Sequence, residues 1–319
     1  MISWKDCKFE DIHADDLHHC FDRTSVAAIR AALGARRPLL VRGEPGVGKS
    51  QLAKAAARAL QRPFVPYVVT SRTESRDLHY SFDAVARLGQ AQILAVAHTG
   101  AGDGLQLLDE KRYVQPGPLW WVFAWKHAKE QHARLPVKGH RPEDPDPSWQ
   151  WNETTGGVVL LLDEIDKADP DVPNGLLESL GNREFSVPYF EKPVCCSHAA
   201  EPPLVVITTN EERELPAAFL RRCLVLHLSL PDDLAPFLIA RGRAHFGTRL
   251  SDAVLAKAAS QLIQERTQQG SDALVRPGQA EYLDLLSALL EVAKPTEEDQ
   301  LRQLEIIKGF ALRKNSPSS

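Results

Sequence analysis

The sequence lacks several features that would each indicate a particular class of protein. It contains no apolar run of about 18 residues, which excludes a membrane-spanning helix. Its first residues, "MISWKDCKFEDIH", include no apolar segment of the kind found in a secretory signal. The five cysteines form no C-x-x-C pair, and the histidines show no metal-ligand spacing. We therefore expect a soluble cytoplasmic protein with reduced thiols and no structural metal.

A strong excess of one charge is also missing. The formal net charge is −4 over 319 residues. This balance argues against bulk non-specific affinity for nucleic acid, although it is compatible with a local basic channel. No internal repeat is present, so a solenoid or propeller is not indicated.

Five short apolar runs predict strands. They are continuous rather than alternating, and candidate helices separate them, which is typical of a parallel sheet covered on both faces. The runs occupy 38–42, 64–69, 157–163, 203–209 and 223–228. We expect an α/β fold with a five-stranded parallel sheet and a ligand at the carboxyl ends of its strands.

The character of the chain changes after Pro231. Apolar residues recur at helical spacing and no strand-like run interrupts them, which predicts a smaller all-α domain over 231–314. The last residues, 315–319, are expected to form a disordered tail. The polar, proline-containing segment 128–157 is expected to be a surface excursion, either a solvated loop or a partner contact.

A phosphate-binding loop follows the first predicted strand. The sequence "GEPGVGKS", 43–50, matches G-x-x-x-x-G-K-[ST] between a strand and a helix. Its glycines allow successive amides to turn toward phosphate oxygens, Lys49 supplies positive charge for the β- and γ-phosphates, and Ser50 offers a hydroxyl to Mg²⁺. The predicted nucleotide-binding residues are Gly43, Glu44, Pro45, Gly46, Val47, Gly48, Lys49, Ser50 and Gln51.

A second motif narrows the reaction to hydrolysis. In "VVLLLDEIDKAD", Asp163 and Glu164 end a buried strand, where carboxylates are costly unless they have a role. Asp163 is placed to hold Mg²⁺, and Glu164 to polarise an attacking water. A nucleoside triphosphatase needs such a glutamate and a kinase does not. No guanine-reading N-K-x-D motif is present, which argues against a small GTPase.

Two further features fit triphosphate hydrolysis. Asn210 ends the apolar strand of "LVVITTNEE", where its amide could hold the attacking water against Glu164. Arg221 and Arg222 precede the last strand, and one of them could reach the triphosphate of a neighbouring subunit. We favour Arg222 as this arginine finger, with Arg221 as the alternative.

Together these residues resemble an AAA+ ATPase, and more closely the MoxR branch of that family, over about 25–290. Residues 156–188 are similar to the Walker B strand of the family with the helix and β-hairpin that follow it. Residues 75–84 and 113–125 resemble the insertion within the second helix, here about 71–125. On this comparison the nucleotide-binding core spans 1–230 and the helical lid 231–314.

The resemblance implies a five-stranded core, a helical lid, and ATP with Mg²⁺ as ligands. It also implies a homo-oligomer, a hexameric ring that remodels protein partners, often partners with von Willebrand A domains. Two positions depart from the branch. An acidic residue is common where Arg221 stands, and the lid's sensor arginine is usual near Ala280, whereas the nearest candidate here is Arg276. Arg276 remains a candidate contact to the γ-phosphate.

Two other functions remain open. The chain could be an ATP- or GTP-driven motor of a nucleic-acid-acting restriction or phage-defence complex, or a nucleotide-gated scaffold that scarcely hydrolyses. The catalytic residues argue against the scaffold. The aromatic run "WWVFAW", 120–125, follows Pro118 at the start of an expected helix. We interpret it as a buried helix face or subunit contact rather than a base-stacking surface.

Overall fold

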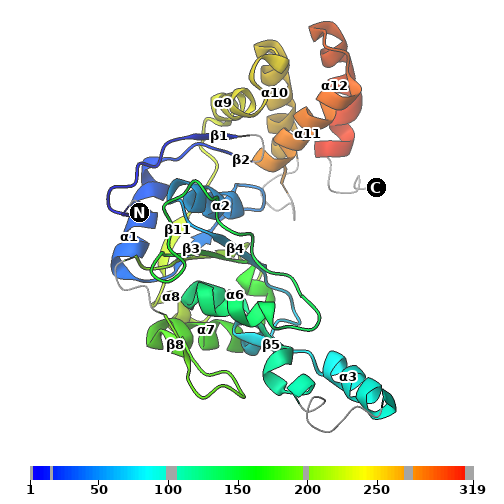
Figure 1. Cartoon of the computed structure of the whole chain (residues 1–319). Coiled ribbons are helices and arrows are strands. Elements are labelled where there is room, and N and C mark those ends of the chain that lie inside the picture. Colours follow the sequence, from blue (N-terminus) through cyan, green and yellow to red (C-terminus); the bar gives the residue numbers. More distant parts are fainter. Residues whose placement is uncertain (1–2, 15–16, 98–105, 197–200, 269–275, 313–319) are drawn as a thin grey trace. The chain divides into compact units, whose positions relative to one another are not determined.

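A five-stranded parallel sheet is the centre of the α/β part, as the apolar runs predict (Figure 1). The computed structural model describes residues 3–14, 17–97, 106–196, 201–268 and 276–312. The strand order is β11-β3-β10-β7-β4. The strands are β3 (Leu39–Arg42), β4 (Phe64–Val68), β7 (Val159–Asp163), β10 (Leu204–Thr209) and β11 (Leu224–His227). The predicted tail, 315–319, lies outside the described residues.

Burial of nearly every side chain explains why the central strands are continuously apolar. All six residues of β10 and the first four of β7 are buried. In β7, Leu162 pairs with Ile207 of β10 and with Tyr67 of β4, in parallel register on both sides. A strand with a neighbouring strand on each side and side chains packed on both faces is shielded from water along its length. Polar residues are therefore confined to its ends.

Short helices connect these strands. Asp22 caps the first of them, accepting a hydrogen bond from the backbone N–H of Ser25 at 2.9 Å. The helices of this part are α1 (Arg23–Ala35), α2 (Lys49–Ala59), α5 (Pro118–Phe123), α6 (Trp125–Ala133), α7 (Asp171–Asn182) and α8 (Ala217–Leu220). A short antiparallel pair, β8 (Glu184–Phe185) and β9 (Val194–Cys195), follows α7.

The aromatic run after Pro118 is buried, which confirms its interpretation as a buried helix face. Every residue of α5 is buried, and Trp125 is also fully buried at the start of α6. Trp120 meets Phe185 and Phe190 edge to face and donates its indole N–H to Nδ1 of His127 at 3.3 Å. These rings therefore fill the core beside β4 and β7 and are not available for stacking on bases.

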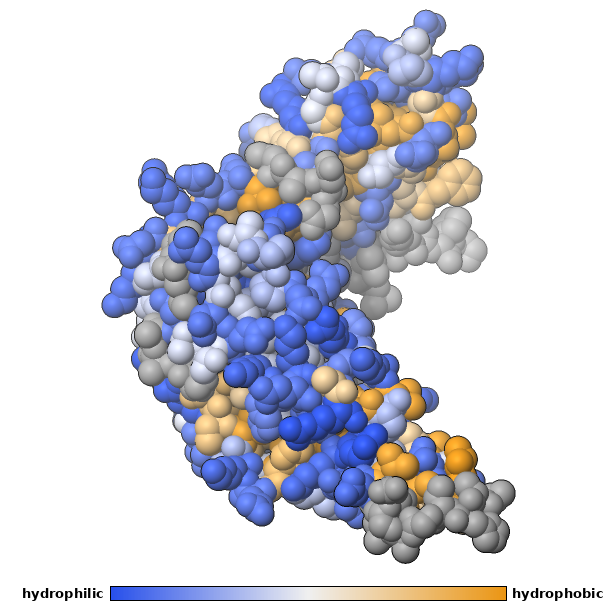
Figure 2. All heavy atoms as spheres, viewed as in Figure 1, coloured by the Kyte–Doolittle hydropathy of each residue, from blue (hydrophilic) through white to orange (hydrophobic). Residues whose placement is uncertain are grey.

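The insertion expected at about 71–125 contains its own small β-sheet and short helices. Antiparallel strands β5 (Tyr80–Phe82) and β6 (Val114–Pro116) pair at its base. Its helical parts are η1 (Ser75–Leu78), α3 (Ala84–Ala97) and η2 (Glu110–Tyr113). Along α3, Val85, Leu88 and Ile93 are 82%, 61% and 63% exposed. The space-filling view shows apolar atoms gathered on this part of the surface (Figure 2).

The segment 128–157, expected to be a surface excursion, begins within α6, since residues 128–133 are helical and Ala128, Gln131 and His132 are buried. Only the part between α6 and β7 is irregular. Residues 134–158 form no helix or strand. Their ends are anchored, since Lys129 pairs with Glu153 at 2.8 Å and the indole N–H of Trp151 donates to the carbonyl of Gly157 at 2.9 Å. The Trp151 ring also lies edge to face with Trp125.

Four longer helices follow the sheet and form a second hydrophobic core. They are α9 (Leu234–Phe246), α10 (Asp252–Gln268), α11 (Gln279–Val292) and α12 (Glu297–Leu312), with a short turn η4 (Gly247–Arg249). Tyr282 is fully buried in this core and donates its hydroxyl to the carbonyl of Leu255 at 3.1 Å. Burial raises the pKa of the Tyr282 phenol.

By internal contacts the chain divides into two compact units. The first comprises 1–10, 21–41 and 53–226, and the second 11–20, 42–52 and 227–319. The second unit thus contains the antiparallel pair β1 (Ile12–Ala14) and β2 (Leu17–His19), and the phosphate-loop segment, besides the helices. Among the described residues no helix combines the length and apolar character needed to cross a membrane. All five cysteines are described, and none forms a disulfide.

We expect Trp120→Ala to lower the free energy of unfolding by about 3–5 kcal/mol, because it removes a fully buried indole and leaves a cavity. Urea denaturation followed by far-UV circular dichroism measures this change. Phe310→Ala is the control, since that ring is 84% exposed and should alter the same quantity little. Equal effects of the two substitutions would contradict the packing described here.

Candidate active site

Two carboxylates stand where β7 ends, as the sequence predicts. Asp163 is the last residue of β7, and Glu164 follows with φ 61° and ψ 50°, a left-handed conformation that non-glycine residues rarely adopt. The Thr208 hydroxyl of β10 stabilises this turn. It donates to Oδ1 of Asp163, and it accepts the backbone N–H of Glu164 at 2.9 Å. One buried hydroxyl therefore fixes both acidic residues.

Both oxygens of the Glu164 carboxylate have a partner. The Asn210 amide, from the chain that follows β10, donates to Oε1 at 3.3 Å. The Lys167 ammonium lies 2.6 Å from Oε2, and this hydrogen bond raises the pKa of Lys167. The structure thus brings Asn210 and Glu164 together through a direct hydrogen bond. The predicted role, in which the amide holds an attacking water against Glu164, remains a prediction.

An open groove of about 310 Å³ lies beside Glu164. Its wall is formed by the chain after β4, β7 and β10, namely Val68, Val69, Thr70, Ser71, Glu164, Asp166, Lys167, Glu212 and Arg213. Asp166 is 3% exposed, and its Oδ2 accepts the backbone N–H of Glu212 at 3.0 Å. Carboxylate, hydroxyl and cationic side chains therefore line this accessible space, with Glu164 among them.

The phosphate loop joins β3 to α2. Residues 43–48 form the loop itself, and Lys49, Ser50 and Gln51 are the first residues of α2. The glycines at 43, 46 and 48 have φ of 150°, 77° and 96°. The Lys49 ammonium, only 7% exposed, donates to the carbonyls of Gly43 at 2.7 Å and Glu44 at 2.9 Å.

The loop fits a triphosphate. A Cβ on Gly48 would meet no atom within 4 Å, so open space lies where this loop turns. Lys49 offers a cation at the same loop, and the start of α2 contributes the positive end of the helix dipole. The dipole and the cation suit phosphate oxygens. Taken each in its own unit, the Ser50 hydroxyl and the Asp163 carboxylate are both oxygen ligands of the kind that Mg²⁺ prefers.

The candidate lid arginine lies just before α11. Arg276 is partly exposed, but its Nε is shielded from solvent and has no hydrogen-bond partner among the described residues. At the usual sensor position, the backbone N–H of Ala280 donates to the carbonyl of Gly46 in the phosphate loop at 3.2 Å. Ala280 thus contacts the phosphate loop through its main chain.

The two candidate fingers lie at the other edge of the sheet. Arg221 and Arg222 are exposed and connect α8 to the start of β11. Because the strands run in parallel, this amino edge is opposite to the edge that carries Asp163, Glu164 and Asn210. All of these residues belong to the first compact unit, and within it the structure does not bring Arg221 or Arg222 close to Asp163 and Glu164.

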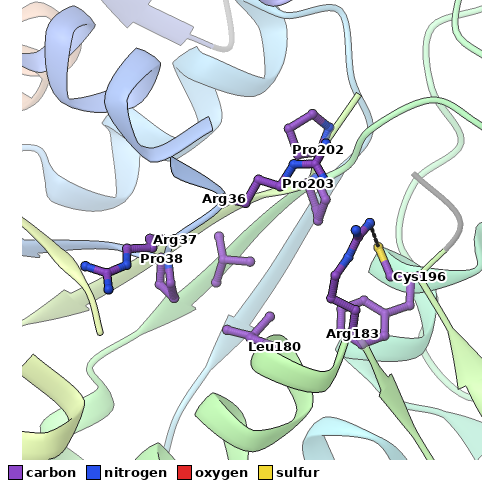
Figure 3. Close-up of a pocket in the computed structure, with 10 residues that line it drawn as sticks. Arg36, Arg37, Pro38, Leu180, Arg183, Cys196, Pro202 and Pro203 are labelled. Atoms are coloured by element: carbon purple, nitrogen blue, oxygen red, sulfur yellow. Dashed lines mark hydrogen bonds between the residues drawn. The ribbon is translucent and has the colours of Figure 1, made fainter. Parts of the chain in front are cut away.

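A second hollow lies at the same amino edge (Figure 3). It is lined by arginines, prolines and apolar side chains, and Arg183 contacts Sγ of Cys196 at 3.8 Å there. Its lining comes from residues that precede β3 and β10 and from the region of α7 and β9. It is therefore separate from the carboxyl edge where the candidate active site lies.

Three residues that the sequence analysis did not identify contact predicted site residues in the structure, namely Thr208, Lys167 and Arg266. Thr208 could have been noticed as a hydroxyl two residues before Asn210, at the end of a predicted strand. Lys167 stands three residues after Glu164, a spacing that brings side chains together in a helical turn. Arg266 gives no local signal, because its partner Glu44 is 222 residues away.

Comparison with known proteins agrees with this geometry. Residues 38–223, more than half of the chain, match the family model described as AAA domain (dynein-related subfamily). None of the curated proteins that were compared matches the sequence significantly.

Solved structures with low sequence identity also resemble the chain. A putative ATPase from Cytophaga hutchinsonii has a TM-score of 0.40 at 14% identity, with 90% of this chain and 79% of that chain covered. A RuvB point mutant from Thermotoga maritima has a TM-score of 0.45 at 14% identity, with 93% and 74% covered.

The family match spans the phosphate loop, the acidic strand end and Asn210. It confirms the predicted enzyme class, a P-loop ATPase, and with it nucleotide binding. The chain belongs to the AAA domain family, in its dynein-related subfamily.

Proposed function

We propose that the protein hydrolyses MgATP as a ring-forming remodelling ATPase of the MoxR type. The observation that carries this proposal is the contact between the Asn210 amide and the Glu164 carboxylate at the ends of adjacent strands. An amide beside a carboxylate can orient one water molecule, and the carboxylate can take its proton during in-line attack. A protein that only binds nucleotide has no need of this pair.

The other predicted residues have complementary roles in this proposal. Lys49 leaves the carbonyls of Gly43 and Glu44 to neutralise charge on the β- and γ-phosphates. Ser50 and Asp163 hold Mg²⁺, with Thr208 keeping the Asp163 carboxylate oriented. Bound MgATP supplies the γ-phosphoryl group that the water attacks.

The position of the arginines favours assembly. A strand of four residues spans about 13 Å, so Arg222 at the start of β11 is remote from the carboxyl edge of its own sheet. An exposed arginine at that place is suited to a neighbouring subunit's triphosphate, with Arg221 as the alternative. This argument supports a homo-oligomeric ring, for which the family resemblance suggests a hexamer.

The client is proposed to be a protein, and a partner with a von Willebrand A domain is the first candidate. The motif resemblance at 156–188 and in the insertion supports the MoxR assignment. The nucleic-acid motor gains no support from the aromatic run, because Trp120, Trp121 and Trp125 are buried. Cytoplasmic location stays a prediction.

We expect Glu164→Gln to lower ATP turnover at least about 100-fold while ATP binding persists, because an amide cannot accept the proton of the attacking water. Phosphate release measures turnover, and a fluorescent ATP analogue measures binding. Glu178→Gln, at an exposed position on α7, is the matched control and should leave both unchanged. Unaltered turnover of Glu164→Gln would refute the catalytic role.

The same variant tests the client. Glu164→Gln is expressed in the native cells and purified with ATP and Mg²⁺, which should hold the client in the bound state. A recurrent protein partner supports remodelling. Recovery of nucleic acid or a nuclease, lost at raised salt, would instead favour a nucleic-acid motor.

We expect Thr208→Val to reduce turnover about tenfold, because misplacement of catalytic groups is costly in rate. It would also destabilise the fold by about 1–3 kcal/mol, since the Glu164 N–H loses its acceptor in a buried site. Thr208→Ser keeps the hydroxyl and should retain most activity. ATP turnover is measured for both variants. Equal losses in Thr208→Val and Thr208→Ser would contradict a role of the hydroxyl in placing the acidic residues.

A further inference from the structure

The phosphate loop is held by the helical part of the chain. Residues 42–52 cluster with 227–319. The backbone N–H of Leu228 donates to the carbonyl of Arg42 at 2.8 Å, and that of Ala280 to Gly46 at 3.2 Å. A Cβ on Gly46 would stand 3.1 Å from Cβ of Ala280, so the loop lies directly against the start of α11.

One side chain adds a charged link to these main-chain contacts. Arg266, near the end of α10, forms an ion pair with the Glu44 carboxylate. It also donates to the carbonyl of Pro277 at 3.0 Å, one residue after Arg276. A guanidinium can serve both acceptors because its donors form a rigid fork. Arg266 therefore joins α10, the approach to α11 and the phosphate loop.

Shielding of one partner distinguishes this link from an ordinary surface ion pair, because Arg266 is largely buried although the Glu44 side chain is 48% exposed. The Arg266 side chain is 14% exposed, whereas both partners of the Arg243–Asp252 pair in the same unit are more than half exposed. Exposed pairs contribute little, because water and salt screen them. Because Arg266 is shielded and has a second acceptor, the position of its guanidinium is more restricted than that of the exposed Arg243.

Glu44 is the point at which two interactions meet. Its side chain accepts Arg266, and its backbone carbonyl accepts the Lys49 ammonium at 2.9 Å. Whatever holds Glu44 therefore also holds one of the acceptors that keep Lys49 at the loop. The Lys49 ammonium exchanges this carbonyl for phosphate oxygens when ATP binds, so the Arg266–Glu44 pair, rather than the Lys49 contact, remains to hold the Glu44 peptide.

We propose that Arg266 is a positioning residue for nucleotide binding, which holds the phosphate loop through Glu44 and links it to the start of α11. The proposal rests on the proposed function only in that the loop binds ATP. Arg266 touches no phosphate; it acts through Glu44 and Pro277. Because coupling is reciprocal, ATP binding also stabilises the junction of α10, α11 and the loop.

The test is a double-mutant cycle on ATP affinity. We expect Arg266→Gln and Glu44→Gln each to raise the Kd of a fluorescent ATP analogue by about fivefold to twentyfold, a usual range for coupled sites. The double variant should bind no more weakly than the weaker single variant, because both changes break one link. Turnover of Arg266→Gln at saturating ATP should stay within about twofold of the wild type. Additive losses, or an unchanged Kd in Arg266→Gln, would overturn the proposal.

Two controls keep the outcome interpretable. Arg243→Gln removes an exposed arginine of the same unit and should leave the Kd unchanged. Arg266→Lys keeps the charge but not the fork, so its Kd should fall between those of the wild type and Arg266→Gln. If Arg266→Gln does not fold, Arg266→Lys and Glu44→Gln carry the test, and wild-type affinity in both overturns the proposal.

Lys49→Ala separates this inference from the proposed function. If Lys49→Ala binds ATP as tightly as the wild type, the loop is not the nucleotide site and the proposed function fails. If Lys49→Ala abolishes binding while Arg266→Gln binds normally, only the positioning role fails.

Discussion

The parallel register between β7 and β10 is the constraint on which the catalytic edge depends. Pairing of Leu162 with Ile207 brings the next residues, Asp163 and Thr208, into hydrogen-bonding distance. A slip by one residue would turn every side chain to the other face of the sheet. Because all of β10 is buried, such a slip would break the core, so hydrophobic packing determines where the polar groups lie.

The phosphate loop depends on backbone freedom instead. Gly43 has φ 150°, and a Cβ there would stand 2.1 Å from the carbonyl oxygen of Leu228. No side chain can be accommodated at that distance. The glycine therefore allows the loop to lie against the chain that leaves β11, and through this contact the loop takes its place in the helical unit. Gly43 of the phosphate-loop motif is therefore also required for packing of the loop against Leu228.

The features that could be predicted from the sequence are those that depend on a pattern among neighbouring residues. The five strands and the loop 43–50 follow from continuous apolar runs and from a fixed spacing of glycines, lysine and serine. The contact of Asn210 with Glu164 could be anticipated because parallel strands end at one edge. The Arg266–Glu44 pair could not, since no periodicity relates residues 222 positions apart. Nor could the left-handed backbone of Glu164, a non-glycine residue whose N–H donates to the Thr208 hydroxyl of the neighbouring strand.

The separation of charges across the sheet bears on regulation in the proposed ring. The carboxyl edge holds Asp163 and Glu164, while Arg221 and Arg222 stand at the amino edge of the same sheet. A parallel sheet cannot bring its two edges together, so in the proposed ring Arg221 or Arg222 would act on the triphosphate of another copy. Each chain would then bind ATP through its own loop but gain full transition-state stabilisation only when assembled. Hydrolysis would thereby depend on subunit contact, and a change in that contact could be coupled to work on a bound protein.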